Sequence, residues 1–497
     1  SFAGMGTHTL IYGFGILLSR AVSFLLLPIY TRFLTPADYG IIALIDMTLD
    51  VFAILAGAQL ALGVFRFYHK AETEPDRNAV VSTALVSLGI SYAAVGAIGF
   101  AMSPYLADWI LGSQENVHLF RIASVGLALG SLMTVPMAYA RVRDLSRFFV
   151  VVNLAKLLIA ATLNIWFLVG MGLGPLAVFL SSAITNGLVG IWLTIWVVRR
   201  VGFRISRDAT KDLFRYGVPL LGMSAATFVA TFGDRFFIQA HWDEAVVGIY
   251  NLGYQFGFLV AMIGFIPFEQ VWAPKRFEVA RRSDRDSIYA RTFIYVNLVL
   301  VTLAVGISVY VHDVLRIMAE ASFWPAADFV PLIVLAYVFQ CWASVQDIGI
   351  LVRERTVYLA AANWVAAGVA ILGYWALIPR WGIWGASYAT LLAFFCRWAL
   401  TYWLSQRLWR VRYSWWPVLQ LSMLGAATVF LAVRFSPEPF LSSVGFRSAM
   451  VGLYFVAVWY SGILTRTEKA TLLSMARGVV GQLAVLARRR GGASQSS

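Results

Sequence analysis

The 497-residue chain has little charge: Asp, Glu, Lys and Arg make up only 13% of it, whereas 60% is hydrophobic. Soluble domains carry about 25% charged residues and are about 45–50% apolar. This composition argues against a soluble globular protein. Because apolar runs recur from one end of the chain to the other, we expect an all-α integral membrane protein with no sizeable soluble domain.

Cysteine and histidine are also scarce, at two and five residues. Cys341 and Cys396 lie inside apolar runs, where a thiol behaves as a small hydrophobic group, so a disulfide framework is not expected. The histidines lack ligand spacing, which argues against a metal site. No lysine follows a glycine, so the chain has no GK[ST] phosphate-binding loop. We therefore expect neither an ATP-driven motor nor a cofactor.

Windows of about 20 apolar residues predict fourteen membrane-spanning helices. Long continuous runs favour helices over the short alternating strands of a membrane barrel. The predicted spans are 9–30, 39–65, 80–102, 118–140, 148–169, 175–198, 215–239, 246–270, 288–310, 328–350, 356–378, 382–405, 417–434 and 447–464.

Basic residues alternate between the loops. The tail and the loops after even-numbered spans hold 29 of the 39 Lys and Arg residues, and the loops after odd-numbered spans hold seven. By the positive-inside rule, both termini face the cytoplasm of a cell that carries this multi-pass protein in its inner or plasma membrane. The net charge of +14 then reflects topology, and no nucleic-acid partner is expected. Three cations remain inside spans: Arg20, Lys156 and Arg397.

Two halves of the sequence resemble each other. YGFGILLSRAVSFLLLPIYTRFLTPADYGI, from Tyr12, matches a stretch from Tyr216, and each runs through an Arg-Phe to a Gly-Ile. Asn153 and Gly172 likewise match Asn363 and Gly382 at an offset of 210. Similar offsets at separate places indicate a duplicated unit of six spans. An even number of spans makes the two repeats parallel, which is an architecture of alternating-access transporters.

The stretch YTRFLTPADYGI at 30–41, together with GAQLALGVFRFY at 57–68 and GIWGASYAT at 382–390, resembles a known family. It is similar to the polysaccharide transport branch of the multidrug/oligosaccharidyl-lipid/polysaccharide (MOP) exporter superfamily, which contains O-antigen flippases. The resemblance implies an N-lobe (1–200) and a C-lobe (201–406) around a central cavity lined by spans 1, 2, 7 and 8. Two extra spans (407–465) and a cytoplasmic amphipathic helix with a disordered tail (466–497) follow.

Arg20 and Asp50 each lie about eleven residues into a span, near the membrane midplane, and Asp46 shares a helix face with Asp50. Ionisable groups at this depth are costly and typically face protein or water. Arg20 could bind a substrate pyrophosphate, while Asp46 and Asp50 release it or bind a coupling ion. A structural Arg20–Asp50 ion pair is the alternative, and both can hold if the pair exchanges partners.

Other polar groups are candidates for gates and for substrate contact. Arg32, Asp38, Asp234 and Arg235 lie at outer span ends and could form an outer gate or serve as interfacial anchors. Lys156 and Arg397 could line a cytoplasmic vestibule or snorkel. Glu269 and Asp347 suit inner-gate or loop partners of nearby arginines. Gln59, Asn251 and Gln255 suit sugar hydroxyls, or hydrogen bonds between helices.

The resemblance implies a flippase, not an enzyme. Its substrate would be an undecaprenyl-pyrophosphate-linked oligosaccharide, moved from the cytoplasmic to the periplasmic leaflet for surface polysaccharide biosynthesis. We expect transport driven by an ion gradient or the membrane potential, and a monomer in contact with membrane lipids. A polysaccharide polymerase and other assembly proteins are further candidate partners. The alternatives are a cation-coupled multidrug exporter and a membrane polymerase or ligase of the same glycolipids, which would need a longer external loop.

Overall fold

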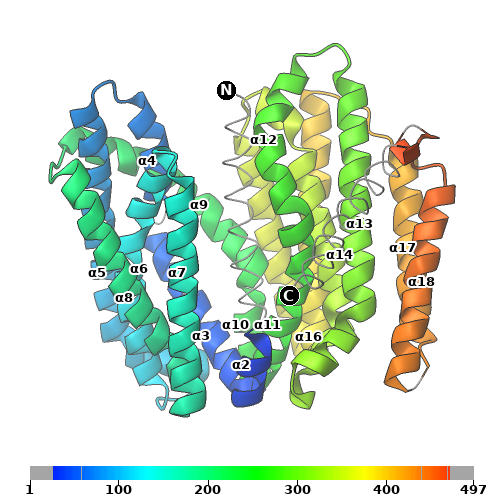
Figure 1. Cartoon of the computed structure of the whole chain (residues 1–497), viewed down its shortest axis with the longest axis horizontal. Helices are drawn as coiled ribbons and strands as arrows, with labels where there is room; N and C mark the ends of the chain where they lie inside the picture. Colours follow the sequence, from blue (N-terminus) through cyan, green and yellow to red (C-terminus); the bar gives the residue numbers. More distant parts are fainter. Residues whose placement is uncertain (1–25, 58, 438, 467, 471–497) are drawn as a thin grey trace, which may run out of the picture. The chain divides into compact units, whose positions relative to one another are not determined.

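The computed structural model describes residues 26–57, 59–437, 439–466 and 468–470, and all regular elements within these ranges are helices (Figure 1). The first half of the chain contains α2 (Leu27–Phe33), α3 (Pro36–Leu55), α4 (Leu60–Lys70), α5 (Glu74–Leu111), α6 (Val117–Val142), α7 (Ser146–Ile165), the π-helix η1 (Trp166–Gly170) and α8 (Pro175–Val201).

The second half contains α9 (Arg207–Phe232), α10 (Asp234–His241), α11 (Glu244–Leu259), the π-helix η2 (Val260–Phe265), α12 (Ile266–Ala280), α13 (Arg285–Met318), the 3₁₀-helix η3 (Ala321–Phe323), α14 (Ala326–Val345), α15 (Ile348–Val352), α16 (Val357–Leu408), α17 (Trp415–Arg434) and α18 (Phe440–Tyr460).

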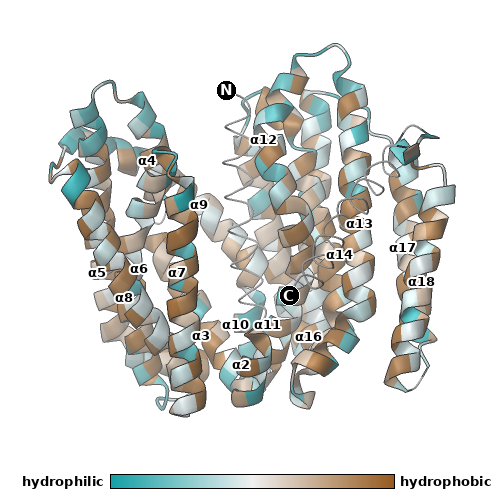
Figure 2. Cartoon of the chain, viewed as in Figure 1, coloured by the Kyte–Doolittle hydropathy of each residue, from teal (hydrophilic) through white to brown (hydrophobic). Residues whose placement is uncertain are grey.

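Twelve helices in the described part of the chain are long and apolar enough to cross a membrane. One of them, α16, holds the two spans predicted at 356–378 and 382–405, which meet at Gly382 with φ 52°. The predicted first span, 9–30, lies mostly outside the described residues. The all-helical architecture of a multi-pass membrane protein is thus confirmed. In Figure 2 the middle parts of helices such as α5 to α8 are hydrophobic and their connecting loops hydrophilic.

The duplication is supported by backbone geometry. Only two described non-glycine residues have a positive φ, Asp144 and Glu354, each at 55° and 210 positions apart. Gly172 and Gly382, also 210 apart, have φ of 64° and 52°. Since left-handed geometry costs a non-glycine residue about 1–2 kcal/mol, its recurrence at one offset is not accidental. The two repeats therefore share their turns as well as their spans.

Two of the four spans expected to line a cavity, 39–65 and 246–270, are interrupted along their length. The predicted span 39–65 is two helices, because Gly57, with φ 84°, ends α3 before α4 begins. Ser91 Oγ donates to the freed carbonyl of Ala56 at 2.7 Å. At the corresponding part of the other repeat, η2 separates α11 from α12. Irregular backbone at membrane depth is tolerated where it is buried in protein or lines water, so these breaks point to the functional region.

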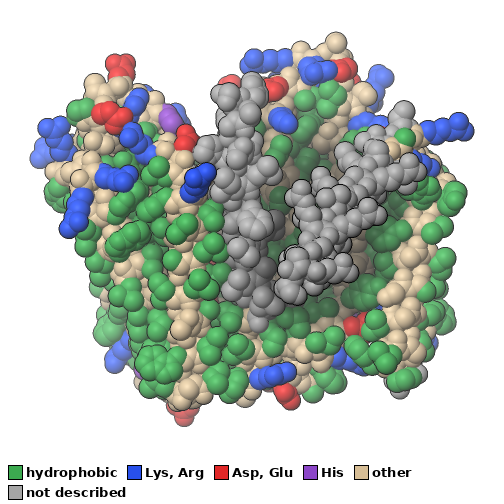
Figure 3. Space-filling model, viewed as in Figure 1, with side chains coloured by type: hydrophobic (Ala, Val, Ile, Leu, Met, Phe, Trp, Pro, Cys, Tyr) green, Lys and Arg blue, Asp and Glu red, His purple; other side chains and the backbone are tan. Residues whose placement is uncertain are grey.

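The core of the first repeat joins α4, α5, α6 and α8. Val64, Leu88, Ala138 and Val197 are completely buried in one apolar cluster. This packing ties the inner half of the broken span, α4, to the rest of its repeat. On the face seen in Figure 3, hydrophobic side chains cover the flanks of the helices, and Lys and Arg gather near their ends.

Cα packing divides the chain into two compact units. The first comprises Ser1–Ile288 and Val311–Arg412, and it contains the predicted N-lobe and all of the predicted C-lobe except Tyr289–Tyr310. The second unites Tyr289–Tyr310, the middle of α13, with Tyr413–Ser497. Inside it, Thr302 and Tyr454 share a hydrogen bond of 3.2 Å. The domain boundaries predicted from the sequence, at 200 and 406, stay a prediction.

The expected tail helix begins at a capping box. The Thr465 N–H donates to Glu468 Oε2 at 2.7 Å, and the Glu468 N–H donates to Thr465 Oγ1 at 3.4 Å. Burial acts to raise the pKa of Glu468, but hydrogen bonds from Tyr295 and Thr465 outweigh it and hold that pKa below its usual range. This pattern starts a helix. Most of the predicted segment 466–497 lies outside the described residues.

Candidate substrate-binding site

Two carboxylates stand out on α3. Asp46 and Asp50 are exposed, whereas Leu44, Ile45 and Met47 beside them are buried. Their spacing of four residues places them on one face of the helix, as predicted. Tyr39, seven residues before Asp46, lies on this face too. We call Tyr39, Asp46 and Asp50 the carboxylate face; exposed charges in a span need water or polar groups around them.

The carboxylate face is joined to α11 of the other repeat. Tyr39 Oη donates to Gln255 Oε1 at 3.5 Å. Asn251 lies one turn before Gln255 on the same side of α11, half-buried, while Gln255 itself is exposed. The structure thus brings Gln255 next to the acidic side of α3 and places Asn251 beside it. Tyr39 was not predicted, although its spacing from Asp46 could have indicated it.

Gln59 joins the two repeats at the break between α3 and α4. Its Nε2 donates to Ser224 Oγ on α9 at 2.7 Å. Further along α4, Phe67 packs edge-to-face on Tyr216 of α9 with ring centroids 6.0 Å apart. In the predicted topology these contacts lie on the cytoplasmic half. Gln59 therefore serves an interhelical hydrogen bond here, the alternative to contact with a sugar.

At the opposite end, which is the outer end in the predicted topology, the repeats meet through two glycines. A Cβ on Gly40 of α3 would lie 1.8 Å from the Glu244 carbonyl oxygen, and one on Gly248 of α11 would lie 1.9 Å from that of Pro36. The helices can approach this closely only because both positions lack side chains. The two glycines, 208 positions apart, belong to the matched Gly-Ile pairs of the repeats. We call this contact the glycine crossing.

The four charges predicted for an outer gate are not brought together. Asp38 caps its own helix, accepting from the Thr35 N–H at 2.9 Å. Asp234 and Arg235 pair with each other at 2.6 Å and are 0% and 1% exposed. Arg32 is exposed, and within the described ranges no ion pair links it or Asp38 to the buried pair. A gating role for these residues stays a prediction.

The Asp234–Arg235 pair is a polar centre within the second repeat. Asp234 Oδ2 accepts from Tyr250 Oη at 2.6 Å and from Thr390 Oγ1 at 3.3 Å. The Arg235 guanidinium donates to the Thr231 carbonyl at 2.8 Å and lies 3.9 Å from the Tyr254 ring centroid. Four helices, α9, α10, α11 and α16, meet around it. Buried charges persist when paired and hydrogen-bonded in this way, so the pair holds these helices in register.

A second charged cluster lies near the predicted inner ends of the second repeat. Arg276 Nη1 is 3.1 Å from Asp347 Oδ1 and 3.5 Å from Glu269 Oε1, which confirms that these acids are partners of a nearby arginine. Asp347 also feels the charge of Arg397. Lys156, half-buried on α7 in the first repeat, is not part of this cluster. Only Arg397 of the predicted vestibule pair is thus placed among other charges.

Arg20 lies outside the described residues, so its part in substrate binding stays a prediction. Among the residues that the structure covers, no group of three or more His, Cys, Asp or Glu side chains could hold a metal ion. The site therefore consists of the carboxylate face, the amides of α11 and two further contacts between the repeats, at Gln59 and at the glycine crossing.

The family of the chain is shown by comparison with known proteins. The family described as "Polysaccharide biosynthesis protein" matches residues 5–279, more than half of the sequence. The chain belongs to this family. A search of curated protein sequences found no match.

Several solved membrane transport proteins share the fold of this chain. A lipid II flippase MurJ in an inward closed conformation aligns with a TM-score of 0.74 at 10% identity, covering 92% of this chain and all of that one. An inward-facing multidrug resistance MATE transporter of the MOP superfamily aligns at 0.57 and 14% identity, covering 80% and 94%. A mutant of the Vibrio cholerae MATE transporter VcmN aligns at 0.51 and 14%, covering 81% and 96%. The predicted membership of the polysaccharide branch of this superfamily is confirmed.

Proposed function

We propose that this chain is a flippase that moves an undecaprenyl-pyrophosphate-linked oligosaccharide from the cytoplasmic to the periplasmic leaflet by alternating access. The observation that carries the proposal is the carboxylate face: two exposed acids on an apolar span, beside the exposed amide of Gln255. A membrane protein keeps such groups where a polar substrate or ion passes. The solved MurJ structure, whose title names a lipid II flippase, supports a lipid-linked substrate.

The chemical groups of the proposed substrate match the types of side chain at the candidate site. A pyrophosphate needs a cation that stays charged at working pH, which Arg20 supplies. Asp46 and Asp50 would hold this arginine when no substrate is bound, or bind the ion that drives the return step. The amides of Asn251 and Gln255 and the hydroxyl of Tyr39 both donate and accept hydrogen bonds, as sugar recognition requires.

Alternating access is supported by the two kinds of contact between the repeats. The glycine crossing consists of van der Waals contact, without a salt bridge to break, so its halves can separate and re-form. Gln59 and Ser224 make a single hydrogen bond at the cytoplasmic half, worth about 1 kcal/mol. Neither contact contains an ion pair that movement between two states would have to break. In this scheme both termini lie in the cytoplasm and the protein in the inner membrane.

Reconstitution in proteoliposomes tests the proposal. With a polyprenyl-pyrophosphate oligosaccharide in one leaflet, wild-type protein should move it to the other, and Arg20→Ala should abolish movement without loss of folding or insertion. Asp50→Asn should remove the dependence on a proton or sodium gradient, while Glu115→Gln, a change at an exposed loop residue, should behave as wild type. Wild-type transport by Arg20→Ala would reject the pyrophosphate site.

The same vesicles test a second function. The acidic carboxylate face and the MATE structures favour a cation-coupled drug exporter. Such a protein would transport cationic drugs and leave the glycolipid in place. Drug transport that depends on Asp46 and Asp50, but not on Arg20, would replace the flippase proposal.

A further inference from the structure

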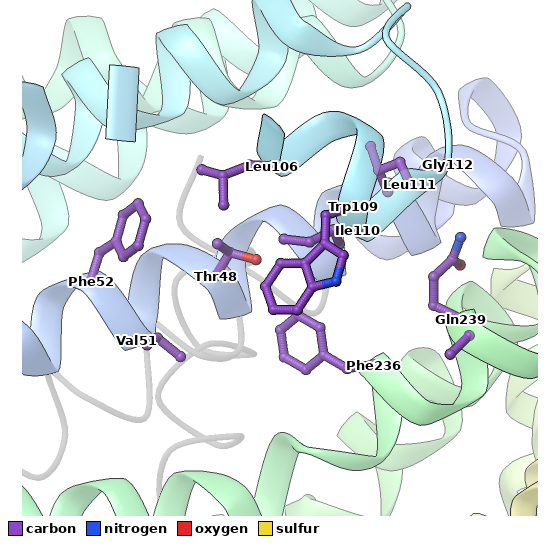
Figure 4. A pocket seen from close by; sticks show the side chains of 11 residues that line it. Thr48, Val51, Phe52, Leu106, Trp109, Ile110, Leu111, Gly112, Phe236 and Gln239 are labelled. Carbon is purple, nitrogen blue, oxygen red and sulfur yellow. The ribbon is translucent and has the colours of Figure 1, made fainter. Parts of the chain in front are cut away.

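A second site lies away from the carboxylate face. A cavity of about 640 Å³ lies between α3, the end of α5 and α10, lined among others by Phe52, Leu106, Trp109, Phe236 and Gln239 (Figure 4). This volume is in the range of pockets that hold small molecules, about 300–1,000 Å³. Helices of both repeats form its walls.

The cavity and the carboxylate face use opposite sides of α3. At about 100° per residue, Thr48 and Phe52, which line the cavity, point about 200° from Asp46 and Asp50 respectively. Thr48 Oγ1 donates to the Leu44 carbonyl at 2.7 Å, so its hydroxyl proton is already bonded within the helix. A ligand in this cavity would therefore not touch the acidic residues of the proposed transport site.

The cavity is amphipathic along its length. In Figure 4, Phe52 and Leu106 lie at one end, Trp109 and Phe236 face each other in the middle, and Gln239 and Gly112 lie at the other end. Because α5 ends at Leu111 on the predicted outer side, the Gln239 end lies nearer the membrane surface. Trp109, 85% exposed, is placed as an interfacial tryptophan would be. The apolar end thus points into the bilayer.

The outer end offers one hydrogen-bond acceptor without a matching donor. Gln239 Nε2 donates to Glu244 Oε1 at 3.0 Å, but Gln239 Oε1 is buried and has no partner among the described residues. Within the ranges that the structure describes, Glu244 forms no ion pair. An unpaired buried acceptor costs about 1–3 kcal/mol, which a ligand donor would recover. A cationic donor fits both the amide oxygen and the nearby carboxylate.

We propose that this cavity binds a phospholipid of the outer leaflet that carries an ammonium headgroup. One acyl chain lies along Phe52, Leu106, Trp109 and Phe236, and the ammonium group donates to Gln239 Oε1 near the Glu244 carboxylate. Since α3 and α5 belong to one repeat and α10 to the other, the bound lipid contacts both and favours the arrangement in which they lie close. This site is independent of the substrate of the proposed transport.

Photolabelling in nanodiscs tests the proposal on the full-length protein. The probes are phosphatidylethanolamine and phosphatidylglycerol carrying the same diazirine acyl chain, and labelled peptides are identified by mass spectrometry. Peptides that contain 105–112 or 236–240 should be labelled about tenfold more by the ethanolamine lipid, as a charge-assisted hydrogen bond implies. Gln239→Leu should make the two lipids label equally while keeping the acyl chain in place.

Filling the cavity supplies the control. Ala240→Trp should reduce labelling of these peptides about tenfold, whereas Ala97→Trp, at an exposed position of α5 outside the lining, should not. If Ala240→Trp fails to fold, Val51→Phe tests the same volume. Equal labelling by both lipids in wild type, or unchanged labelling in the filled variants, would overturn the proposal. Displacement of the label by a cationic amphiphilic drug below lipid concentrations would assign the cavity to a drug instead.

Discussion

Replacing either glycine of the glycine crossing with alanine should open the outer contact between the repeats. The added Cβ would lie 1.8 Å from the Glu244 carbonyl oxygen at Gly40, or 1.9 Å from that of Pro36 at Gly248. Real Cβ contacts are essentially never shorter than 3.0 Å, so α3 and α11 must separate by at least 1.1 to 1.2 Å. The obstacle is backbone, which cannot turn aside as a side chain could.

Overpacking of this kind costs about 1–3 kcal/mol. If the crossing exists only when the outer side is closed, that cost shifts the equilibrium away from the closed state by about 5–150-fold. Intrinsic helix propensity acts in the other direction, because alanine is favoured over glycine by about 1 kcal/mol within a helix. An observed opening would therefore come from the contact between the helices and not from weakening of either helix.

Distances between spin labels measure the effect. The labels are attached at Phe33→Cys and His241→Cys, both exposed, in a protein whose Cys341 and Cys396 are replaced by alanine. In Gly40→Ala and Gly248→Ala, a larger fraction of molecules should show a long distance between the labels, and transport should be slower. Gly89→Ala and Gly368→Ala are matched controls, since a Cβ there meets nothing within 4 Å. Wild-type distances and transport in both crossing variants would refute the reasoning.

Two further predictions concern stability. Asp234→Asn should lower the thermal unfolding midpoint in detergent, since leaving the buried Arg235 without its carboxylate costs about 3–5 kcal/mol. The control Asp108→Asn, at an exposed position of α5, should leave the midpoint unchanged. An equal fall of the midpoint in both variants would contradict a stabilising role of the Asp234–Arg235 pair. Asp144→Val and Glu354→Val should each lower the unfolding midpoint of the protein more than Asp144→Gly and Glu354→Gly do, because a β-branched side chain disfavours φ of 55°. Equal midpoints for the valine and glycine variants would contradict this.

The sequence predicted most of the architecture because membrane spans are a property of local composition. Hydrophobic windows located the helices, and the 210-residue offset that matches Asn153 to Asn363 recurs in the backbone as the paired turns at Asp144 and Glu354. The break at Gly57 was missed, since an apolar run continues across it. A hydropathy window measures how apolar a segment is, and it does not detect a single residue whose backbone adopts the left-handed conformation.

The site was predicted less completely because side-chain direction and partners depend on packing. Asp46 and Asp50 were found since their i, i+4 spacing is visible in sequence. Asp234 and Arg235 were predicted at an outer gate from their position near a span end. The fold buries both, with Asp234 bonded to Tyr250 and Thr390 and Arg235 in contact with Thr231 and Tyr254. A charge at a helix end can face either way, and only tertiary contacts decide which.

The glycine crossing shows how a duplicated chain makes its own contact between repeats. Gly40 approaches Glu244 while the matched Gly248 approaches the matched Pro36, and such a reciprocal contact is what an approximate twofold axis relating the parallel repeats produces. Matched residues meet each other at such an axis, so each repeat needs a small residue there for the helices to touch. In the sequence, the Gly-Ile pairs marked only the similarity of the two halves. A close crossing of two helices at the axis requires a small residue at the same position of each repeat. The Gly-Ile pairs meet this requirement, and they therefore identify where the two halves meet.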